Sequence, residues 1–456
     1  MLSLHSPPPE VQSQKKPLHT LDFVKTHISS HPRFCLFLIF LFIQVLVISI
    51  ARNSPPCFPA VVRDPVVSTA TGDKPASVSY DEECPSGRVY VYDLPSMFNR
   101  DLPLHNCTDL SPWNWQCGID PPPSSAASCR EISLNRGTGP TSSPESAAAF
   151  YIPFYAGLAV GKYLWVNDTS KRDWHCEMML QWVKKHKYWK KLNGSDHFMT
   201  IGRITWDFRR LTDPGQIWGS TFLNMPAMQK VTRFIIEKAP GDDRDVSVPY
   251  PTGFHPKTRE ILNQWQNFAR NYNRPSLFTF IGATRSWVNN DFRGLLLNYC
   301  YNEPGSCRVV DCATAQCSTD SSVILEALLG SEFCLQPRGD SFTRRSVFDC
   351  MVAGSVPVFF WKRTAYDQYE WFLPGEPESY SVYIDHEAVR NGSISIKQVL
   401  MRYSKEEIKR KRERVIETIP RIVYRMGNGK FEDAFDIALD GVLERIKEER
   451  GWPSDR

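Results

Sequence analysis

The chain has 456 residues, 42% of them hydrophobic and 23% charged, which is enough apolar surface for globular cores. Its formal net charge is only +4 and its basic residues form no long stripe, which argues against nucleic acid as a partner. Many of the 34 prolines lie near the N-terminus, where the chain also has its most apolar run.

That run, Phe34–Ala51 (34–51), predicts a transmembrane signal anchor. It has 18 residues, close to the about 17–25 that a bilayer-spanning helix needs. Basic residues in the preceding segment 1–33 predict that this tail is cytosolic and that the body lies in the lumen: Lys15, Lys16, Lys25 and Arg33. The alternative is a signal peptide cleaved near Ser49–Ala51, for which both the run and its leader are long.

The segment 52–87 is rich in proline and lacks apolar periodicity, so it predicts an extended lumenal stem. Twelve of the 13 cysteines follow the anchor, which favours an oxidising compartment. Four sequons predict glycosylation there: Asn106, Asn167, Asn193 and Asn391. Four neighbouring cysteines lack the paired spacing of a zinc site and predict disulfides whose connectivity stays open: Cys300, Cys307, Cys312 and Cys317.

The rest of the chain predicts two Rossmann-like α/β domains, 88–273 and 274–456, divided near the NYNRPS segment at 271–276. Short apolar runs alternate with helical patterns, which is typical of parallel sheets covered by helices. The predicted strands are 88–94, 147–155, 197–201, 277–282, 307–311, 333–335, 356–360 and 381–384. The predicted helices are 174–186, 227–237, 259–271, 342–353, 404–418 and 430–449, the last a terminal helix of the second domain.

The segment 333–360 (FCLQPRGDSFTRRSVFDCMVAGSVPVFF) places a polar turn between a strand and a helix. In open α/β sheets ligands bind at such turns, where glycine permits a tight backbone and the helix N-terminus favours an anion. Hydroxyls and arginines could bind phosphate oxygens, and a later carboxylate could bind ribose, so the predicted nucleotide-sugar residues are Gly339, Ser341, Thr343, Arg344, Arg345 and Asp349. The two arginines should point about 100° apart on a helix, so one of them is expected to face the anion. The alternative is a capped helix with a solvated arginine face.

Four motifs occur in order along the chain and resemble one known family. They are GRITWDFRR (202–210), VPYPTGFHP (248–256), GDSFTRRSVFD (339–349) and AGSVPVFF (353–360), and together they resemble the exostosin-type glycosyltransferases of family 47, in particular the plant xyloglucan galactosyltransferases. The resemblance implies a type II Golgi membrane protein with a GT-B fold of two facing Rossmann-like domains. It also implies an inverting, metal-independent transfer from a UDP-sugar to a polysaccharide acceptor, with UDP-galactose and xyloglucan as nearest precedents. Other Golgi glycosyltransferases are possible partners.

One region departs from the family pattern. Members of the family carry an amphipathic helix between the first strand and the FYIPFYAG stretch, whereas Cys107–Ser146 here is rich in Pro, Ser and Gly. Donor binding is still expected with this change, but recognition of the acceptor is in question. Two further hypotheses therefore stay open, a non-catalytic glycan-binding or scaffolding protein and a transferase for another donor such as UDP-galacturonic acid or UDP-arabinose.

Inversion needs a base for the acceptor hydroxyl and positive groups for the departing diphosphate. Arg285, which follows a predicted strand of the second domain, is a further candidate for the diphosphate. The candidates for the base are Asp196, His197 and Asp207, each with a structural alternative: a turn residue, a core histidine, and a partner for Arg209 or Arg210.

No metal site is expected. Asp243-Arg244-Asp245 matches the short DxD motif of metal-dependent transferases, but it lies in a charged segment that predicts a solvated loop. Aromatic residues around the first and second motifs could form a sugar platform, although most aromatics at such spacings are core: Trp206, Trp218, Tyr250 and Phe254.

Overall fold

The computed structural model describes residues 87–102, 144–211, 218–285, 288–315, 317, 321–426 and 431–451. The predicted tail and anchor, nearly all of the predicted stem, the sequon at Asn106 and most of the altered segment 107–146 lie outside these residues. Within the described ranges, no helix combines the length and the apolar character that crossing a membrane requires.

The first sheet has five parallel strands in the order of the chain, β1-β2-β3-β4-β5. The strands are β1 (Val89–Val91), β2 (Ala149–Tyr151), β3 (His197–Thr200), β4 (Thr232–Ile235) and β5 (Asp245–Ser247). Because parallel crossovers are right-handed, a sheet wound in one direction has its crossover helices on one face. Side chains of these helices share one apolar cluster with Phe150, Met199 and Ile235: α4 (Ala156–Gly161), α5 (Thr169–Val183) and α6 (Lys187–Leu192).

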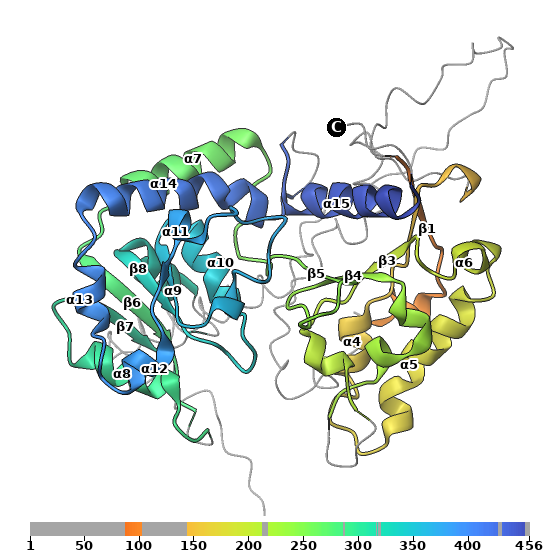
Figure 1. The fold of residues 1–456 in the computed structure, drawn as a ribbon, viewed down its shortest axis with the longest axis horizontal. Coiled ribbons are helices and arrows are strands. Elements are labelled where there is room, and N and C mark those ends of the chain that lie inside the picture. The colour runs from red at the N-terminus through yellow and green to blue at the C-terminus, as the bar shows by residue number, and fades with distance from the viewer. Residues whose placement is uncertain are drawn as a thin grey trace, which may run out of the picture. The chain divides into compact units, whose positions relative to one another are not determined.

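The other face of the first sheet is covered by the terminal helix, α15 (Ala434–Glu449), which lies beside β1 and β3 in Figure 1. Its apolar side chains, including Val442 and Ile446, belong to the same core cluster as Ala149 and Phe198. Arg450, at its C-terminal end, donates to the Asp196 carboxylate at 2.6 Å. The terminal helix, which was predicted as part of the second domain, therefore also covers one face of the first sheet.

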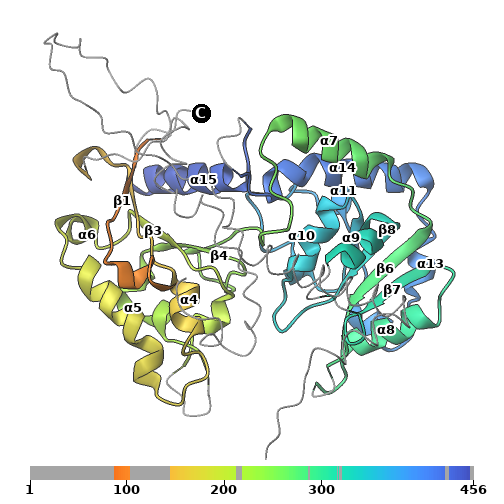
Figure 2. The same cartoon turned by 180° about the vertical axis from the view of Figure 1, so that it is seen from behind.

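The second sheet also has five parallel strands, in the order β10-β9-β8-β6-β7. Figure 2 shows β8, β6 and β7 of this sheet side by side. They are β6 (Ser276–Gly282), β7 (Cys307–Asp311), β8 (Ser331–Gln336), β9 (Val356–Phe359) and β10 (Val382–Tyr383). Helices α8 (Phe292–Tyr301), α12 (His386–Arg390) and α13 (Ile396–Leu400) pack in one core cluster with this sheet. Four more helices contribute side chains to hydrophobic core clusters that include residues of the second sheet. They are α7 (Arg259–Asn271), α9 (Ser321–Leu329), α10 (Arg345–Val352) and α14 (Lys405–Ile422).

The prediction of an α/β fold with two parallel sheets is confirmed. Helix α7, which begins at Arg259 and so precedes the predicted boundary at 273, packs against α14. The short helices are α11 (Pro377–Tyr380) and the 3-10 turns η1 (Ser96–Phe98), η6 (Pro144–Ser146), η7 (Thr205–Phe208), η8 (Phe222–Asn224), η9 (Pro226–Gln229) and η10 (Lys362–Thr364).

The predicted helix 227–237 is wrong, because these residues form the end of η9 and then the strand β4. All four residues of β4 are buried between β3 and β5, and the segment is rich in β-branched and aromatic side chains. Each predicted strand overlaps an observed strand, while β5 was not predicted at all.

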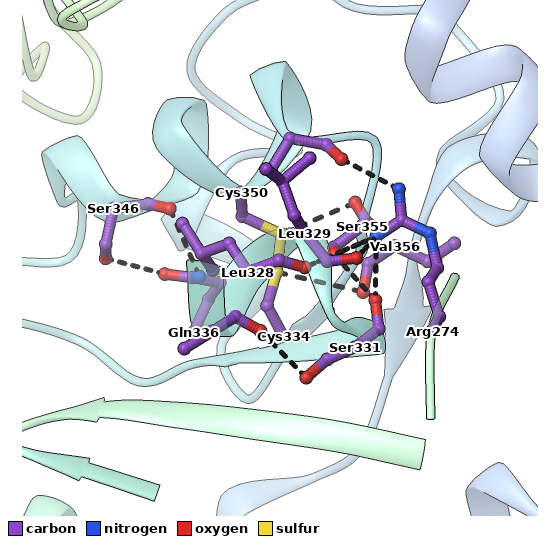
Figure 3. The surroundings of a disulfide bond; sticks show 12 residues. Arg274, Leu328, Leu329, Ser331, Cys334, Gln336, Ser346, Cys350, Ser355 and Val356 are labelled. Atoms are coloured by element: carbon purple, nitrogen blue, oxygen red, sulfur yellow. Dashed lines mark hydrogen bonds between the residues drawn. A yellow bond between two sulfur atoms is a disulfide. The ribbon is translucent and has the colours of Figure 1, made fainter. Parts of the chain in front are cut away.

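Disulfides are confirmed for the cysteine-rich segment, as Cys300–Cys307 and Cys312–Cys317. A third, Cys334–Cys350, joins β8 to α10 (Figure 3). Beside it, the Arg274 guanidinium donates to carbonyl oxygens at or near the C-terminal ends of three helices: Ala269 of α7 at 2.9 Å, Leu329 of α9 at 2.6 Å and Ala353 after α10 at 2.8 Å. A cation at these negative helix ends joins the three helices at the edge of the second sheet where β6, β8 and β9 begin.

Candidate functional site

The second sheet changes its winding direction between β6 and β8. The chain passes from β6 to β7 on one side and then returns to place β8 on the other side of β6. Loops that leave the carboxyl ends of two such strands diverge, and ligands of open α/β sheets bind in the crevice between them. The turn 337–344, which begins with the predicted polar residues 337–340, follows β8, and Arg285 follows β6, so both lie at this point.

Three arginines meet around Gly339 in that turn. The Arg285 Nη1 donates to the Gly339 carbonyl and to the Asp340 carboxylate, both at 3.2 Å. A Cβ atom at position 339 would lie 3.1 Å from Cγ of Arg344 and 3.4 Å from Nη2 of Arg293. Glycine therefore leaves room for the side chains of Arg344 and Arg293 to lie close to the backbone.

The positive charge of this arginine cluster (Arg285, Arg293 and Arg344) is only partly balanced. Asp291, the N-cap of α8, accepts from the backbone nitrogens of Arg285 at 2.7 Å and Arg293 at 3.2 Å. Within the described residues, neither Arg293 nor Arg344 forms an ion pair, and Nε of Arg293 and Nη1 of Arg344 are buried without a hydrogen-bond partner. Buried unpaired donors of this kind are costly, so the cluster is suited to an anion with several oxygens.

Burial also lowers the pKa of Arg344, and the neighbouring Arg293 and Arg285 lower it further. The pKa of Arg293 is lowered by burial and then by Arg285. An anion bound among the three arginines would counteract the lowering of the pKa that their like charges cause. Arg293 was not predicted; the signal in the sequence is its place in the first turn of the helix that follows Arg285.

The two adjacent arginines of the turn have different surroundings. Arg344 is the N-cap of α10 in an extended conformation (φ −149°, ψ 147°), and its side chain joins the cluster. Arg345 is the first residue of the helix, is exposed, and its Nε lies 3.3 Å from the Asp349 carboxylate. Burial raises the pKa of Asp349. Of the predicted residues, Arg344 thus lies with Arg285 and Gly339, whereas Arg345 and Asp349 pair with each other.

The predicted hydroxyl donors of the turn are buried, and Thr343 is bound to Glu237 instead of facing the arginines. Glu237 follows β4 of the first domain and is fully buried. Its Oε2 accepts from the backbone nitrogen of Thr343 at 3.0 Å and from Oγ1 at 3.1 Å. Its Oε1 accepts from Nε1 of Trp206 at 3.3 Å. Ser341 is 7% exposed in the same turn. Glu237 was not predicted, because it lies in the segment mistaken for a helix.

Two of the three predicted bases belong to a core network. Asp196 and His197 lie at the amino end of β3, the edge opposite to the carboxyl ends where ligands bind. The His197 ring contacts Asp196 at 2.7 Å through Nδ1 and the Tyr92 hydroxyl at 2.8 Å through Nε2, and both residues are buried. Burial lowers the pKa of His197 against the opposing effect of Asp196. This geometry agrees with the alternative prediction for His197, a histidine of the core.

The third candidate, Asp207, lies in η7, with its carboxylate 2.7 Å from Nε of Arg203. Its predicted alternative partners are bound elsewhere, Arg209 to Asp245 and Arg210 to Asp173. Asp207 lies within electrostatic reach of Tyr250. Burial is the largest cause that raises the pKa of Tyr250 to about 12. Glu237 and Asp207 also raise this pKa, whereas Thr343 and Arg344 lower it.

Two of the four predicted platform aromatics lie near this region. Trp206 is 39% exposed and bonded to Glu237, and Tyr250 is the neighbour of Asp207 and Arg344 just described. Trp218 instead packs on Trp165 at 5.9 Å and Phe254 stacks on Trp265 at 5.0 Å. The guanidinium of Arg363 lies 5.8 Å from the Trp206 ring and 4.4 Å from the Phe342 ring.

The DxD-like segment divides into an exposed and a buried part. Asp243 is exposed, as a solvated loop requires. The expectation is wrong for Asp245, which begins β5, is buried, and binds Arg233 at 2.7 Å and Arg209 at 2.8 Å. Across the described ranges no group of three or more His, Cys, Asp or Glu side chains is arranged to hold a metal ion. The sequons at Asn167, Asn193 and Asn391 are exposed.

Comparison with known proteins adds sequence similarity to this geometry. A family model described as the Exostosin GT47 domain matches residues 83–400. Xyloglucan galactosyltransferase XLT2 of Arabidopsis thaliana is 52% identical over 402 residues, which cover 82% of this chain and 77% of that protein. Two further proteins of that plant are each 36% identical. Xyloglucan galactosyltransferase MUR3 aligns over 80% of this chain and 63% of its own length, and Xyloglucan-specific galacturonosyltransferase 1 over 80% and 58%.

Proposed function

This chain belongs to the exostosin GT47 family, and from that premise we propose that it transfers galactose from UDP-galactose to xyloglucan with inversion at the sugar C1. The high identity to a xyloglucan galactosyltransferase over most of both chains supports this donor and acceptor. The observation that carries the proposal is the arginine cluster at the switch point of the second sheet, whose unpaired donors suit a diphosphate. We also infer a GT-B arrangement, with the donor bound mainly by the second domain.

In the proposed reaction an acceptor hydroxyl oxygen attacks C1 of the galactose while the bond from C1 to the diphosphate oxygen breaks. The hydroxyl proton passes to a base, and UDP leaves with the electron pair of the broken bond. Negative charge grows on the diphosphate, so fixed guanidinium groups stabilise the transition state more than the ground state. We retain Asp207 as the proposed base, because the other two candidates, Asp196 and His197, lie at the amino end of β3, opposite to the edge where ligands bind.

The proposal includes no metal ion, since the arginine cluster supplies the positive charge that a metal would otherwise supply. It also includes a Golgi location with a single-pass type II topology, the body in the lumen and Phe34–Ala51 in the membrane. Protease added to intact vesicles should then leave the body protected and shorten the N-terminal tail. Other Golgi glycosyltransferases remain proposed partners.

A second donor, UDP-galacturonic acid, is favoured by one observation. Nη2 of Arg363 is buried without a hydrogen-bond partner in the described part of the chain, beside Trp206 and Phe342. A uronic acid carboxylate would satisfy such a donor, and one relative is a galacturonosyltransferase by name.

The experiment that tests the proposal is competition between donors. The purified chain is incubated with xyloglucan oligosaccharides and equal amounts of UDP-galactose, UDP-galacturonic acid and UDP-arabinose, and the products are resolved by mass. We expect the galactose product to predominate. A dominant galacturonic acid product would show that UDP-galacturonic acid is the preferred donor. Glycan binding without any product would favour a non-catalytic protein.

A further inference from the structure

A short segment of the first domain, 236–238, contacts the second domain at three consecutive residues. The Tyr369 hydroxyl donates to the Ile236 carbonyl at 2.8 Å. Glu237 accepts from Thr343, and the Lys238 backbone nitrogen donates to Oε1 of Gln368 at 3.0 Å. This segment leaves the carboxyl end of β4, so the contact lies at the edge of the first sheet where a ligand is expected.

Glu237 is the buried charge in this contact. In the described part of the chain it forms no ion pair, yet its side chain is fully buried. A buried carboxylate without a cation is costly unless several hydrogen bonds satisfy it. Its oxygens accept from Thr343 twice, from the Trp206 indole, and from the Phe342 backbone nitrogen at 3.4 Å. With these donors around both oxygens, the carboxylate is not free to act as a base.

The bonds made by Glu237 end one residue before Arg344. They fix the backbone of Phe342 and Thr343, and Arg344 follows in the extended conformation that turns its side chain toward Gly339 and away from the helix. The same carboxylate orients the Trp206 indole of the first domain. A single buried group therefore sets the direction of a donor-site arginine and of an exposed ring on the other domain.

We propose that Glu237 is a positioning residue that couples the two domains, holding Arg344 in place for the diphosphate through Thr343. This inference rests on the proposed function, because it assumes that Arg344 binds the diphosphate of the donor. It predicts that donor affinity depends on a residue of the first domain that never touches the donor.

The test compares two full-length variants, Glu237→Gln and the matched control Glu370→Gln. Glu370 is also a carboxylate between the domains, bonded to Nζ of Lys238 at 2.9 Å, but it is largely exposed and does not contact the turn. In Glu237→Gln, an amide NH₂ replaces one oxygen and faces an N–H donor, so the turn must shift. We expect UDP affinity, measured by calorimetry, to fall about tenfold or more in Glu237→Gln and to change less than about twofold in the control.

The donor KM should rise and kcat should fall in Glu237→Gln, whereas a purely structural role would lower the melting temperature and leave the UDP affinity of the folded protein unchanged. That second result, with a wild-type chain that binds UDP, would overturn the inference alone. A wild-type chain that does not bind UDP would instead overturn the proposed function.

A second variant keeps the test decisive if Glu237→Gln does not fold. Thr343→Val removes one of the hydrogen bonds to Glu237 and leaves the carboxylate and the backbone donor in place. We expect a loss of UDP affinity of about threefold to tenfold in the folded variant. Where Glu237→Gln does fold, the loss in the double variant should not exceed that of Glu237→Gln alone, because both changes act through one contact. Unchanged affinity in Thr343→Val, or fully additive losses, would contradict the proposal.

Discussion

At the scale of single residues, the turn after β8 shows how neighbouring side chains of one type take different roles. Arg344 stands before the first helical residue and joins Arg285 and Arg293, while Arg345 is in the helix and pairs with Asp349. The sequence predicted that one of the two would face the anion. It could not predict which, because the answer depends on whether α10 begins at 342 or at 345, and helix starts are uncertain by such amounts.

We expect Arg344→Ala to reduce transferase turnover by about a hundredfold to a thousandfold, since it removes a fixed charged donor from the developing negative charge. Arg344→Lys should recover part of this loss, because a point charge cannot reproduce the guanidinium fork. The matched control is Arg345→Ala, which should stay within about threefold of the wild type, since Arg345 is exposed and outside the cluster. Steady-state kinetics and UDP calorimetry on folded variants decide this. Unchanged turnover and UDP affinity in both alanine variants would return the turn to a capped helix without a ligand.

The buried His197 gives the fold a dependence on pH. Burial holds its folded-state pKa below the value of about 6.5 of an exposed imidazole. Below that pH the unfolded chain binds a proton that the folded chain excludes, so the free energy of unfolding falls as the pH falls and is unaffected above about pH 7.5. The slope from this site should approach about 1.4 kcal/mol per pH unit.

Urea unfolding of the wild type and of His197→Gln measures this slope. The range from about pH 5 to about pH 7.5 brackets the ordinary pKa of an imidazole. The variant should be less stable throughout but should show a flatter dependence on pH. Parallel curves for the two proteins would mean that His197 is not the group that titrates.

At the scale of elements, Arg274 joins several helices of the second domain through hydrogen bonds. Its guanidinium binds carbonyl groups at or near the ends of α7, α9 and α10, and also the Ser331 carbonyl at 3.0 Å, next to the Cys334–Cys350 disulfide (Figure 3). Burial lowers its pKa, and the neighbouring Arg412 lowers it further.

We expect Arg274→Met to lower the free energy of unfolding by about 3 kcal/mol or more, because buried carbonyl groups lose their donors. Arg274→Lys should recover part of the loss, since an ammonium has three donors against five in arginine. Arg402→Met, at an exposed arginine, is the control and should be near neutral. Chemical unfolding followed by circular dichroism measures all three. A neutral Arg274→Met would show that water replaces the guanidinium.

Strands were predicted from apolar runs, and this succeeded where flanking turns bounded the run. It failed for β4, because a short buried strand and a buried helix have the same apolar content over a few residues. That error hid Glu237, which lies just after the strand. The strand β5 was missed because it begins with Asp245, a charged residue that is buried through ion pairs with Arg209 and Arg233, and pairing of this kind has no local signal in sequence.

At the scale of the whole molecule, the two α/β domains followed from the alternation of patterns, but the strand order did not. The site lies at the switch point between β6 and β8, and that point is visible only when the pairing of strands is known. Chain order placed α15 in the second domain, whereas the sequential winding of the first sheet leaves one face open and α15 covers it. Neither fact could be read from local periodicity.

The central claim is that this chain is an inverting galactosyltransferase whose arginine cluster replaces a metal. The most direct measurement is galactose transfer from UDP-galactose to xyloglucan oligosaccharides by the full-length chain with excess chelator, with the new linkage assigned by NMR. The account predicts a β-linked galactose at a rate that the chelator leaves unchanged, and the same result in Asp243→Ala. A product with an α-linkage, or a reaction that requires added manganese and is abolished by Asp243→Ala, would contradict it.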